Sequence, residues 1–442
     1  MFLSLPSLNV DASGNGFAFS GLAGPSGSSG QPLDAWRHVN GQNNEILRFS
    51  ADSAFGPNLG AGWRFNYAGT PGSGYLNLTV LDSPALLIDA PVPSPANLSN
   101  SAIVVHLPGA GNAPCMVSRD TGNIGPGIAG LSFSTAFQGY FPVAHDNRIY
   151  VNAIATGSAN REGIWRVCDG APRPLAVGGL SGILGPNTGI LDATFLQIRG
   201  NPQPLGNDIA FLAQFRNGVN PELSTGIFQN QGNLNTRLAQ SIDTGNLEPN
   251  FGLSRFASLD PLQTSIAGAG PFLAFEAIAT EPSNTSVPGL WRIRPQGNPE
   301  PVALVGVSGV YAPADGQTFQ RFDRWSLFAN GDIVAECVVN GGPHGLYRFA
   351  IGRAPELILR VGQSIAVATS AGPAQATVNS FSVFGGDTSQ SASSHPGGFD
   401  SWAARDGSLL VSASVAVGAS NANVLMLSSV SNLDAVFANG FE

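Results

Sequence analysis

A short phrase returns along this chain of 442 residues, as GPNLG at 56–60, GPNTG at 185–189 and EPNFG at 248–252. Six loops of this kind each carry one proline, and each proline is followed by a phenylalanine. The prolines are Pro57, Pro126, Pro186, Pro249, Pro313 and Pro373, and the phenylalanines are Phe65, Phe133, Phe195, Phe256, Phe319 and Phe381. Self-similarity at a period of this size indicates a repeat architecture.

A second element recurs with the same period and gives seven units. It is a short apolar run, preceded in most units by a turn pair such as Asn330-Gly331, which is a hairpin signal. The seven runs begin at or beside Phe17, Leu86, Ile149, Ile209, Leu273, Ile333 and Leu409. One further strand precedes this run, after the proline loop, and two more apolar runs follow it, so the pattern predicts four strands per unit and no sustained helix.

Seven four-stranded units predict an all-β fold, a seven-bladed β-propeller that forms one domain over 1–442. The blades are expected at roughly 1–55, 56–125, 126–185, 186–248, 249–312, 313–372 and 373–442. Inner strands are expected near 2–10, 141–145, 322–328 and 399–405. Each blade would consist of consecutive residues, with 433–438 as the outer strand of blade seven. A stack of separate β-sandwiches or an open solenoid is the alternative architecture.

The repeated motifs resemble those of exported bacterial proteins with tandem NxxGxxAF repeats. The likeness is most specific in the third runs GIWR (163–166), GLWR (289–292) and GLYR (345–348). The final DAVFANGFE also resembles short endings of many exported bacterial proteins. This resemblance implies a propeller and export. It implies no activity, because most such proteins are uncharacterised, and it transfers no catalytic residue.

Composition excludes several classes of function. All 20 basic residues are arginine, which excludes lysine-dependent chemistry. The net charge of −9 disfavours nucleic acid and anionic lipid as partners. No apolar run is long enough to predict a membrane span. The start MFLSLPSLNV does not read as an export signal, so either the protein stays inside the cell or the chain begins after a removed leader. The resemblance implies the second, and we therefore expect an extracellular, cell-surface or periplasmic monomer whose signal is not in this chain.

Cysteine and histidine spacing predicts no metal or redox centre. Cys115, Cys168 and Cys337 form no CxxC pair and are expected to be small buried residues, while a Cys115–Cys168 bridge remains an open alternative. The five histidines fall in five different units and none is paired at metal-ligand spacing. They are His38, His106, His145, His344 and His395; only His395, in a Gly/Ser-rich insert, is a candidate for function.

Two motifs imitate known sites but are better explained by the repeat. Ser118–Gly122 and Ser241–Gly245 resemble the start of a sialidase Asp-box, without its closing tryptophan. Asp11–Gly16 has the spacing of a calcium loop but lacks the closing glutamate, since residue 22 is leucine. We interpret the first two as parts of the proline loop and the third as a hairpin turn.

The remaining candidates recur at matching places in the repeat. Asp323 matches Asp400, and Glu276 matches Glu336; a glycosidase would need such carboxylates to face each other across a cleft. The aromatic-Arg pairs could form a carbohydrate platform: they are Trp36-Arg37, Trp165-Arg166, Trp291-Arg292 and Tyr347-Arg348. Recurrence favours structural roles for all of them, with the aromatic ring buried between blades and the arginine outward.

The sequence therefore predicts a non-catalytic, exported β-propeller that acts as a binding or scaffold module for an unknown protein or glycan. No catalytic, cofactor-binding or metal-ligating residue is assigned, and no cofactor is expected. The alternative is a glycan-active hydrolase or lyase with its site in the axial pocket. Carboxylates with perturbed pKa would favour the enzyme.

Overall fold

The computed structural model describes most of the chain, and the account below is confined to those residues. They are 7–10, 16–22, 33–39, 42–48, 55–65, 77–80, 85–93, 95–96, 100–134, 142–145, 148–190, 192–216, 223–241, 247, 249, 255–259, 264–313, 316–369, 372–383, 408–418 and 420–429. Over these ranges the fold is all-β, with a single 3-10 turn, η1 (Gly182–Leu184), and no α-helix. The chain divides into two compact units, Met1–Gly179 and Leu180–Glu442.

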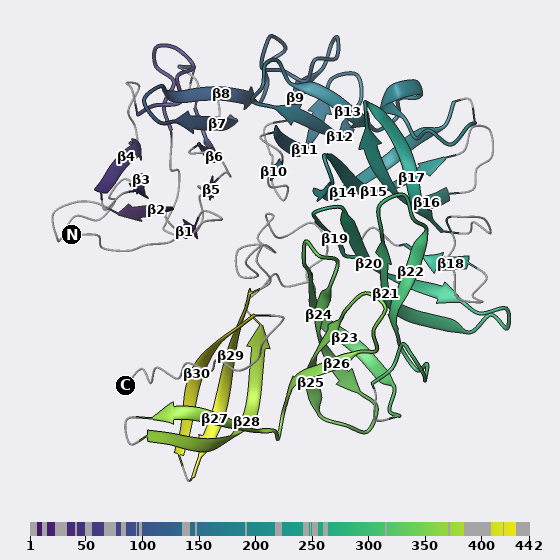
Figure 1. Cartoon of the computed structure of the whole chain (residues 1–442). Helices are drawn as coiled ribbons and strands as arrows, with labels where there is room; N and C mark the ends of the chain where they lie inside the picture. Colours follow the sequence, from purple (N-terminus) through teal and green to yellow (C-terminus); the bar gives the residue numbers. More distant parts are fainter. Residues whose placement is uncertain are drawn as a thin grey trace. The chain divides into compact units, whose positions relative to one another are not determined.

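The first unit holds three antiparallel sheets whose strands follow one another in sequence (Figure 1). Sheet one consists of β1 (Ser7–Val10), β2 (Gly16–Leu22), β3 (Leu33–Val39) and β4 (Gln42–Leu47). Sheet two consists of β5 (Asn77–Val80), β6 (Leu86–Pro91), β7 (Ser101–Leu107) and β8 (Gly111–Val117). Sheet three consists of β9 (Ser132–Phe133), β10 (Val143–His145), β11 (Arg148–Thr156), β12 (Arg161–Val167) and β13 (Arg173–Val177).

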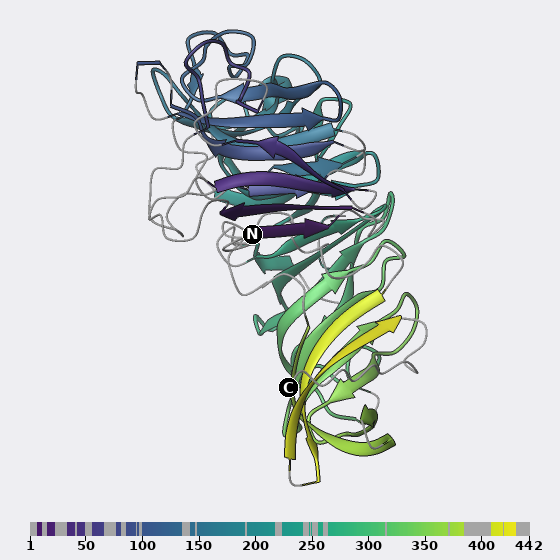
Figure 2. The ribbon, with the colours of Figure 1, turned by 90° about the vertical axis from the view of Figure 1, so that its left-hand side faces the viewer.

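The second unit holds four sheets with the same sequential order. Sheet four consists of β14 (Thr194–Leu205), β15 (Asp208–Arg216), β16 (Leu223–Gln231) and β17 (Leu234–Gln240). Sheet five consists of β18 (Arg255–Ser258), β19 (Ile266–Ala269), β20 (Phe272–Thr280), β21 (Ser286–Ile293) and β22 (Pro299–Leu304). Sheet six consists of β23 (Phe319–Leu327), β24 (Ile333–Val339), β25 (His344–Phe349) and β26 (Glu356–Arg360). Sheet seven consists of β27 (Ser364–Thr369), β28 (Gly372–Val383), β29 (Ser408–Val417) and β30 (Ser420–Ser429), the last two lying side by side in Figure 2.

A repeated pair of aromatic rings forms the centre of sheets three to six. The phenylalanine after each proline loop meets the aromatic residue of the third run edge to face, which is a favoured geometry for π-systems. The pairs are Phe133–Trp165 at 5.1 Å, Phe195–Phe228 at 5.0 Å, Phe256–Trp291 at 5.3 Å and Phe319–Tyr347 at 5.2 Å between ring centroids. All eight rings are buried, as the repeat predicts for these positions.

The glycine two residues before each of these third-run aromatics is a packing requirement. A Cβ at Gly163, Gly289 or Gly345 would lie under 3.0 Å from the aromatic ring that follows it. Real Cβ atoms do not approach that closely, so the ring can lie flat over the strand only if residue i−2 has no side chain. This explains the spacing of GIWR, GLWR and GLYR.

The proline loops are held by a buried asparagine on the fourth strand of a sheet. Asn112 of β8 donates its Nδ2 hydrogens to the carbonyls of Gly56 (2.9 Å) and Ile46 (3.2 Å). Asn235 of β17 likewise donates to the carbonyls of Gly185 (3.1 Å) and Ile183 (3.4 Å). The glycine is the one that begins GPNLG and GPNTG, so the recurring phrase is the loop that this asparagine binds.

The predicted strands agree with the described ones in most places. Strand β1 lies within 2–10 and pairs with β2, β10 lies within 141–145, and β23 overlaps 322–328; residues 399–405 and 433–438 fall outside the described part. The prediction of a sixth proline loop around Pro373 is wrong. Pro373 lies in β28 opposite Ala368 of β27, a strand that was not predicted. Proline is tolerated there because it is the second residue of β28, and β28 pairs with β29 only from Thr377 onward.

Candidate functional site

The two matching glutamates lie on the second strand of their sheets. Each is the fourth residue of the apolar run that forms this strand. In sheet five this residue is Glu276 of β20, and in sheet six it is Glu336 of β24. The first strand of sheet five is interrupted opposite Glu276, because β20 pairs with β19 up to Phe275 and with β18 again from Ile278. Glu276 is therefore an interior side chain beside a break in the ladder.

Glu276 is bound by the indole of a neighbouring sheet. Trp325 of β23 donates Nε1–H to Glu276 Oε1 over 2.6 Å. Burial raises the pKa of this carboxyl to about 7, and the indole hydrogen bond opposes part of that rise. Desolvation disfavours the carboxylate, so close to neutral pH both the acid and its anion are populated.

Asp323, Glu336 and His344 form a second polar cluster, on three successive strands of sheet six. His344 Nε2 lies 3.5 Å from Asp323 Oδ2 and 3.8 Å from Glu336 Oε2. The imidazole stacks on Phe381 of sheet seven at 4.9 Å, with an interplanar angle of 3°. Asp323 also accepts a hydrogen bond of 2.6 Å from Arg321 Nε. The matching carboxylates Glu276 and Glu336 are thus found in different environments.

Cys337 lies next to this cluster as the free cysteine of the described chain. Its thiol is fully buried, and burial, with smaller contributions from Asp323 and Glu336, raises its pKa. A thiol in such surroundings stays protonated and unreactive. This agrees with its predicted role as a small buried residue.

The aromatic-Arg strands place their arginines differently from the prediction. Trp165, Trp291 and Tyr347 are buried as expected, whereas Trp36 is only partly buried. The arginines were expected to point outward, and for Arg37 and Arg292 this is wrong.

For Arg292 the reason is electrostatic pairing between strands and turns. Arg292 Nε donates to Glu300 Oε1 at 2.7 Å, and its Nη1 donates to the carbonyl of Gly331, also at 2.7 Å. Arg348 donates to Asp332 Oδ2 from Nε (2.9 Å) and Nη2 (2.6 Å). These guanidinium groups hold the β23–β24 turn and are not available as a carbohydrate platform.

The sialidase-like motifs have the structural role that the repeat suggested. Ser118 Oγ accepts a hydrogen bond of 3.0 Å from the backbone N–H of Ser101, and Ser241 Oγ accepts one of 3.0 Å from that of Thr225. Asp120 Oδ2 accepts from the N–H of Ile124 at 3.2 Å within the loop. Residues 11–15, Asp243, His395 and Asp400 lie outside the described part of the chain.

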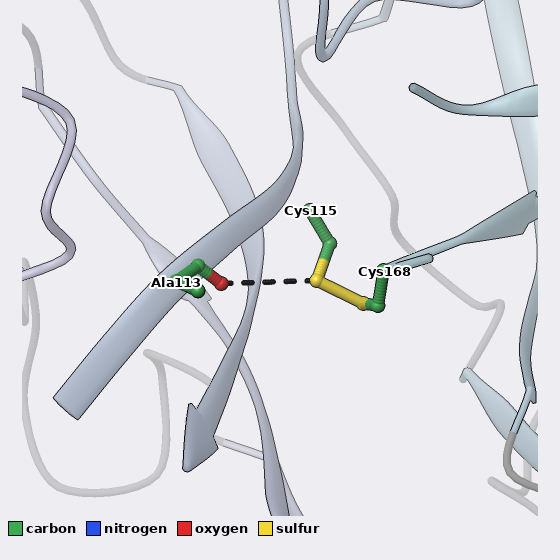
Figure 3. Close-up of a disulfide and its surroundings, with 3 residues drawn as sticks. All are labelled: Ala113, Cys115 and Cys168. Carbon is green, nitrogen blue, oxygen red and sulfur yellow. Dashed lines mark hydrogen bonds between the residues drawn. A yellow bond between two sulfur atoms is a disulfide. The ribbon is translucent and has the colours of Figure 1, made fainter. Parts of the chain in front are cut away.

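Two of the three cysteines form a disulfide, which was the open alternative. Cys115 at the end of β8 is bonded to Cys168 just after β12, linking sheets two and three (Figure 3). The Sγ atom of Cys115 lies 3.7 Å from the carbonyl oxygen of Ala113. Stable disulfides are typical of proteins in oxidising compartments.

Within the described ranges, no group of three or more His, Cys, Asp or Glu residues is arranged to hold a metal ion. Nor does any helix there have the length and apolar character needed to cross a membrane.

Two important polar contacts were not foreseen from the sequence. Asn112 and Asn235 are isolated asparagines in otherwise variable fourth strands, and only the loops that they bind are obviously repeated. The sequence signal that could have identified these asparagines is the polar residue that stands opposite each of them on the third strand of the same sheet. Asn112 Oδ1 lies 2.9 Å from His106 Nδ1, and Asn235 Oδ1 accepts a bond of 2.8 Å from Asn230 Nδ2, at the same register position.

No family model and no curated protein matches this chain. Among solved structures, the Dos1 propeller matches with a TM-score of 0.34 and 11% identity, over 99% of this chain and 94% of that one. Dipeptidyl peptidase 4 of Porphyromonas gingivalis matches with a TM-score of 0.39 and 6% identity, over 96% of this chain and 51% of that one. The α-L-arabinanase of Penicillium chrysogenum, complexed with arabinobiose, matches with a TM-score of 0.27 and 9% identity, over 73% and 85%. These TM-scores are too low to assign a fold or an activity to this chain.

Proposed function

We propose that this chain is an exported, seven-bladed β-propeller that acts as a non-catalytic binding or scaffold module. The observation that carries the proposal is the recurring loop contact. Within the first unit, Asn112 on the fourth strand of sheet two binds the end of sheet one's fourth strand and the loop that follows it. Between two blades of a propeller, the chain leaves the fourth strand of one blade, passes the fourth strand of the next blade and enters the first strand of that next blade.

Two further features support the parts of this proposal. The Cys115–Cys168 disulfide favours export, because cytosolic thiols are kept reduced. The recurring charged side chains favour a non-catalytic role, because Arg292 donates to Glu300 and to a backbone carbonyl, and Arg348 donates to Asp332. A binding surface would then consist of the loops at one end of the blades.

A scattering measurement and a ligand screen test the two halves of the proposal. Small-angle scattering of the full chain should fit a compact disc; the extended profile of two separated bodies or an open solenoid contradicts the propeller. Immobilised glycan and peptide arrays should show retention of the protein without chemical change of the ligand. Release of shortened glycans would instead establish the enzyme.

The enzyme remains the second candidate, and one observation favours it. Glu276 is a partly buried carboxyl with a pKa of about 7 beside an indole, an environment that suits a general acid. If glycan cleavage is found, Glu276→Gln should abolish it while leaving ligand retention intact. Cleavage that survives this substitution removes Glu276 from consideration.

A further inference from the structure

Arg37 of β3 is a buried cation that, among the described residues, lacks the counter-charge of its equivalents. It is only 7% exposed, and Nε and Nη1 are buried with no hydrogen-bond partner in the described part of the chain. A buried unpaired charge costs several kcal/mol unless it finds a partner, so this geometry calls for an anion.

The repeat identifies what is missing. Arg292 stands opposite Glu300 in the strand register, and Arg348 stands opposite Glu356. Arg37 stands opposite Asn44 instead. A neutral amide therefore occupies the register position where sheets five and six supply a carboxylate.

The neighbouring acid of sheet one is already engaged. Glu45 accepts hydrogen bonds of 2.8 Å and 2.7 Å from Nε and Nη2 of Arg48. Its carboxylate is therefore committed to another guanidinium.

His106 is a second basic group near Arg37. His106 of β7, in sheet two, is close enough for the positive charge of Arg37 to lower its pKa, although burial is the larger cause. In the neutral tautomer His106 donates Nδ1–H to Asn112 Oδ1, since Asn112 uses its Nδ2 hydrogens for the loop, and Nε2 carries no hydrogen. A bound anion favours protonation of this ring, and Nε2–H then becomes a donor beside the guanidinium.

We propose that Arg37, assisted by His106, binds a small oxyanion at the position that a glutamate carboxylate occupies in sheets five and six. The ligand class is a carboxylate, sulfate or phosphate group, either free or carried on a larger ligand. Guanidinium binds such groups through paired, charge-assisted hydrogen bonds. The site concerns the first unit alone and does not depend on the function proposed above.

Thermal unfolding of the full chain with sulfate, acetate or glucuronate tests the site, with sodium chloride at matched ionic strength as the reference. A ligand that binds only the folded state raises the Tm with its concentration, so low-millimolar oxyanion should raise it by a few degrees. Arg37→Met should remove this rise, and the exposed Arg353→Met should keep it. If glucuronate raises the Tm as acetate does, the oxyanion is one carried on a sugar. If acetate raises the Tm and glucuronate does not, the ligand is a free ion.

Asn44→Glu provides the complementary variant. It restores the carboxylate of sheets five and six at an exposed position, so the chain should fold even if Arg37→Met does not. We expect its Tm without oxyanion to exceed that of the wild type and its response to oxyanion to be lost. The proposal is overturned if the wild type shows no shift beyond chloride, if Arg37→Met responds like the wild type, or if Asn44→Glu retains the full response.

Discussion

Trp325 Nε1 lies 2.6 Å from Glu276 Oε1, and this hydrogen bond joins the first strand of sheet six to the second strand of sheet five. The indole can donate to either form of the carboxyl group and favours the anion, but the larger effect is burial, which penalises the anion. The folded state therefore becomes less stable when Glu276 loses its proton. This gives the fold a dependence on pH that can be measured.

Glu276→Gln should stabilise the protein at pH 8 and have little effect at pH 5. The pKa of Glu276 is raised from 4.5 to about 7, so the folded state binds more protons than the unfolded state between these values. Stability is therefore fully present below about pH 4.5 and falls as the pH rises towards 7. Since the group is partly exposed, we expect about 2 kcal/mol at pH 8, less than the full shift implies. Denaturant unfolding at both pH values measures it.

The reciprocal variant is Trp325→Phe, which keeps a ring and removes the donor. Because the indole hydrogen bond lowers the pKa of Glu276, its loss should move the midpoint of the stability profile to higher pH. A profile with the wild-type midpoint in Trp325→Phe, or a pH-independent gain in Glu276→Gln, contradicts the assignment to this pair.

Reducing the Cys115–Cys168 disulfide should lower the Tm without unfolding the chain at room temperature. The bridge closes a loop with a sequence separation of 53 residues, for which chain-entropy arguments give about 4 kcal/mol and experience with native bridges about 2–5 kcal/mol. Thermal scans with and without a reductant measure this loss. The Cys115→Ser/Cys168→Ser variant is the control, because its Tm should be low and indifferent to reductant.

A thiol count provides an independent check of the same bridge. Denatured, unreduced protein should react with one equivalent of a thiol reagent, from Cys337, and reduced protein with three. Three reactive thiols without reduction would show that the bridge is absent.

The sequence predicts the units of this fold far better than it predicts the polar contacts within them. Apolar periodicity and turn residues locate the second and third strands, because most described residues of these strands are buried in sheets two to six. The period fails at Pro373, where the same Gly-Pro pattern that marks a loop elsewhere begins strand β28. A local pattern cannot reveal which strand will pair beside it.

The candidate site shows the same limit. Glu276 and Glu336 are equivalent in the repeat, yet one meets Trp325 and the other lies near His344. Trp325 comes from the following sheet, whereas His344 comes from the next strand of the same sheet, so the pattern alone suggests a shared role that the structure does not bear out. The orientation of Arg37 and Arg292 was missed because alternation places a side chain on a face but does not describe its partners.

Asn235→Ala should destabilise the protein by about 2–3 kcal/mol, because two carbonyls and the Asn230 amide lose a buried partner. His106 occupies the place of Asn230 in sheet two, so His106→Asn should preserve the loop contact and cost much less. Chemical unfolding of both variants makes the comparison. Equal losses for the two substitutions would mean that the repeat equivalence is wrong.

His106→Asn should also make the protein less sensitive to acid. The pKa of His106 is lowered in the folded state, mainly by burial, so the unfolded state binds more protons as the pH falls. Stability contributed by neutral His106 is present above its ordinary pKa and is lost on acidification. Arg37 and Asn112 are the charged and hydrogen-bonding groups that act on it. A wild-type acid profile in His106→Asn contradicts this.

Gly289 and Trp291 should be energetically coupled, because the indole occupies the space that a Cβ at Gly289 would need. A Cβ there would lie 2.9 Å from the ring and 2.7 Å from the carbonyl oxygen of Ala303.

Gly289→Ala alone should cost about 1–3 kcal/mol by overpacking, and Trp291→Ala about 3–5 kcal/mol by leaving a cavity. In the double variant the ring is absent and the added methyl group fills part of the cavity, so the total loss should be smaller than the sum by about 1 kcal/mol or more. Unfolding free energies of the three variants complete this cycle. Additive losses would mean that the glycine is required by the Ala303 carbonyl and the Leu304 side chain, and that the spacing in GLWR is not set by the ring.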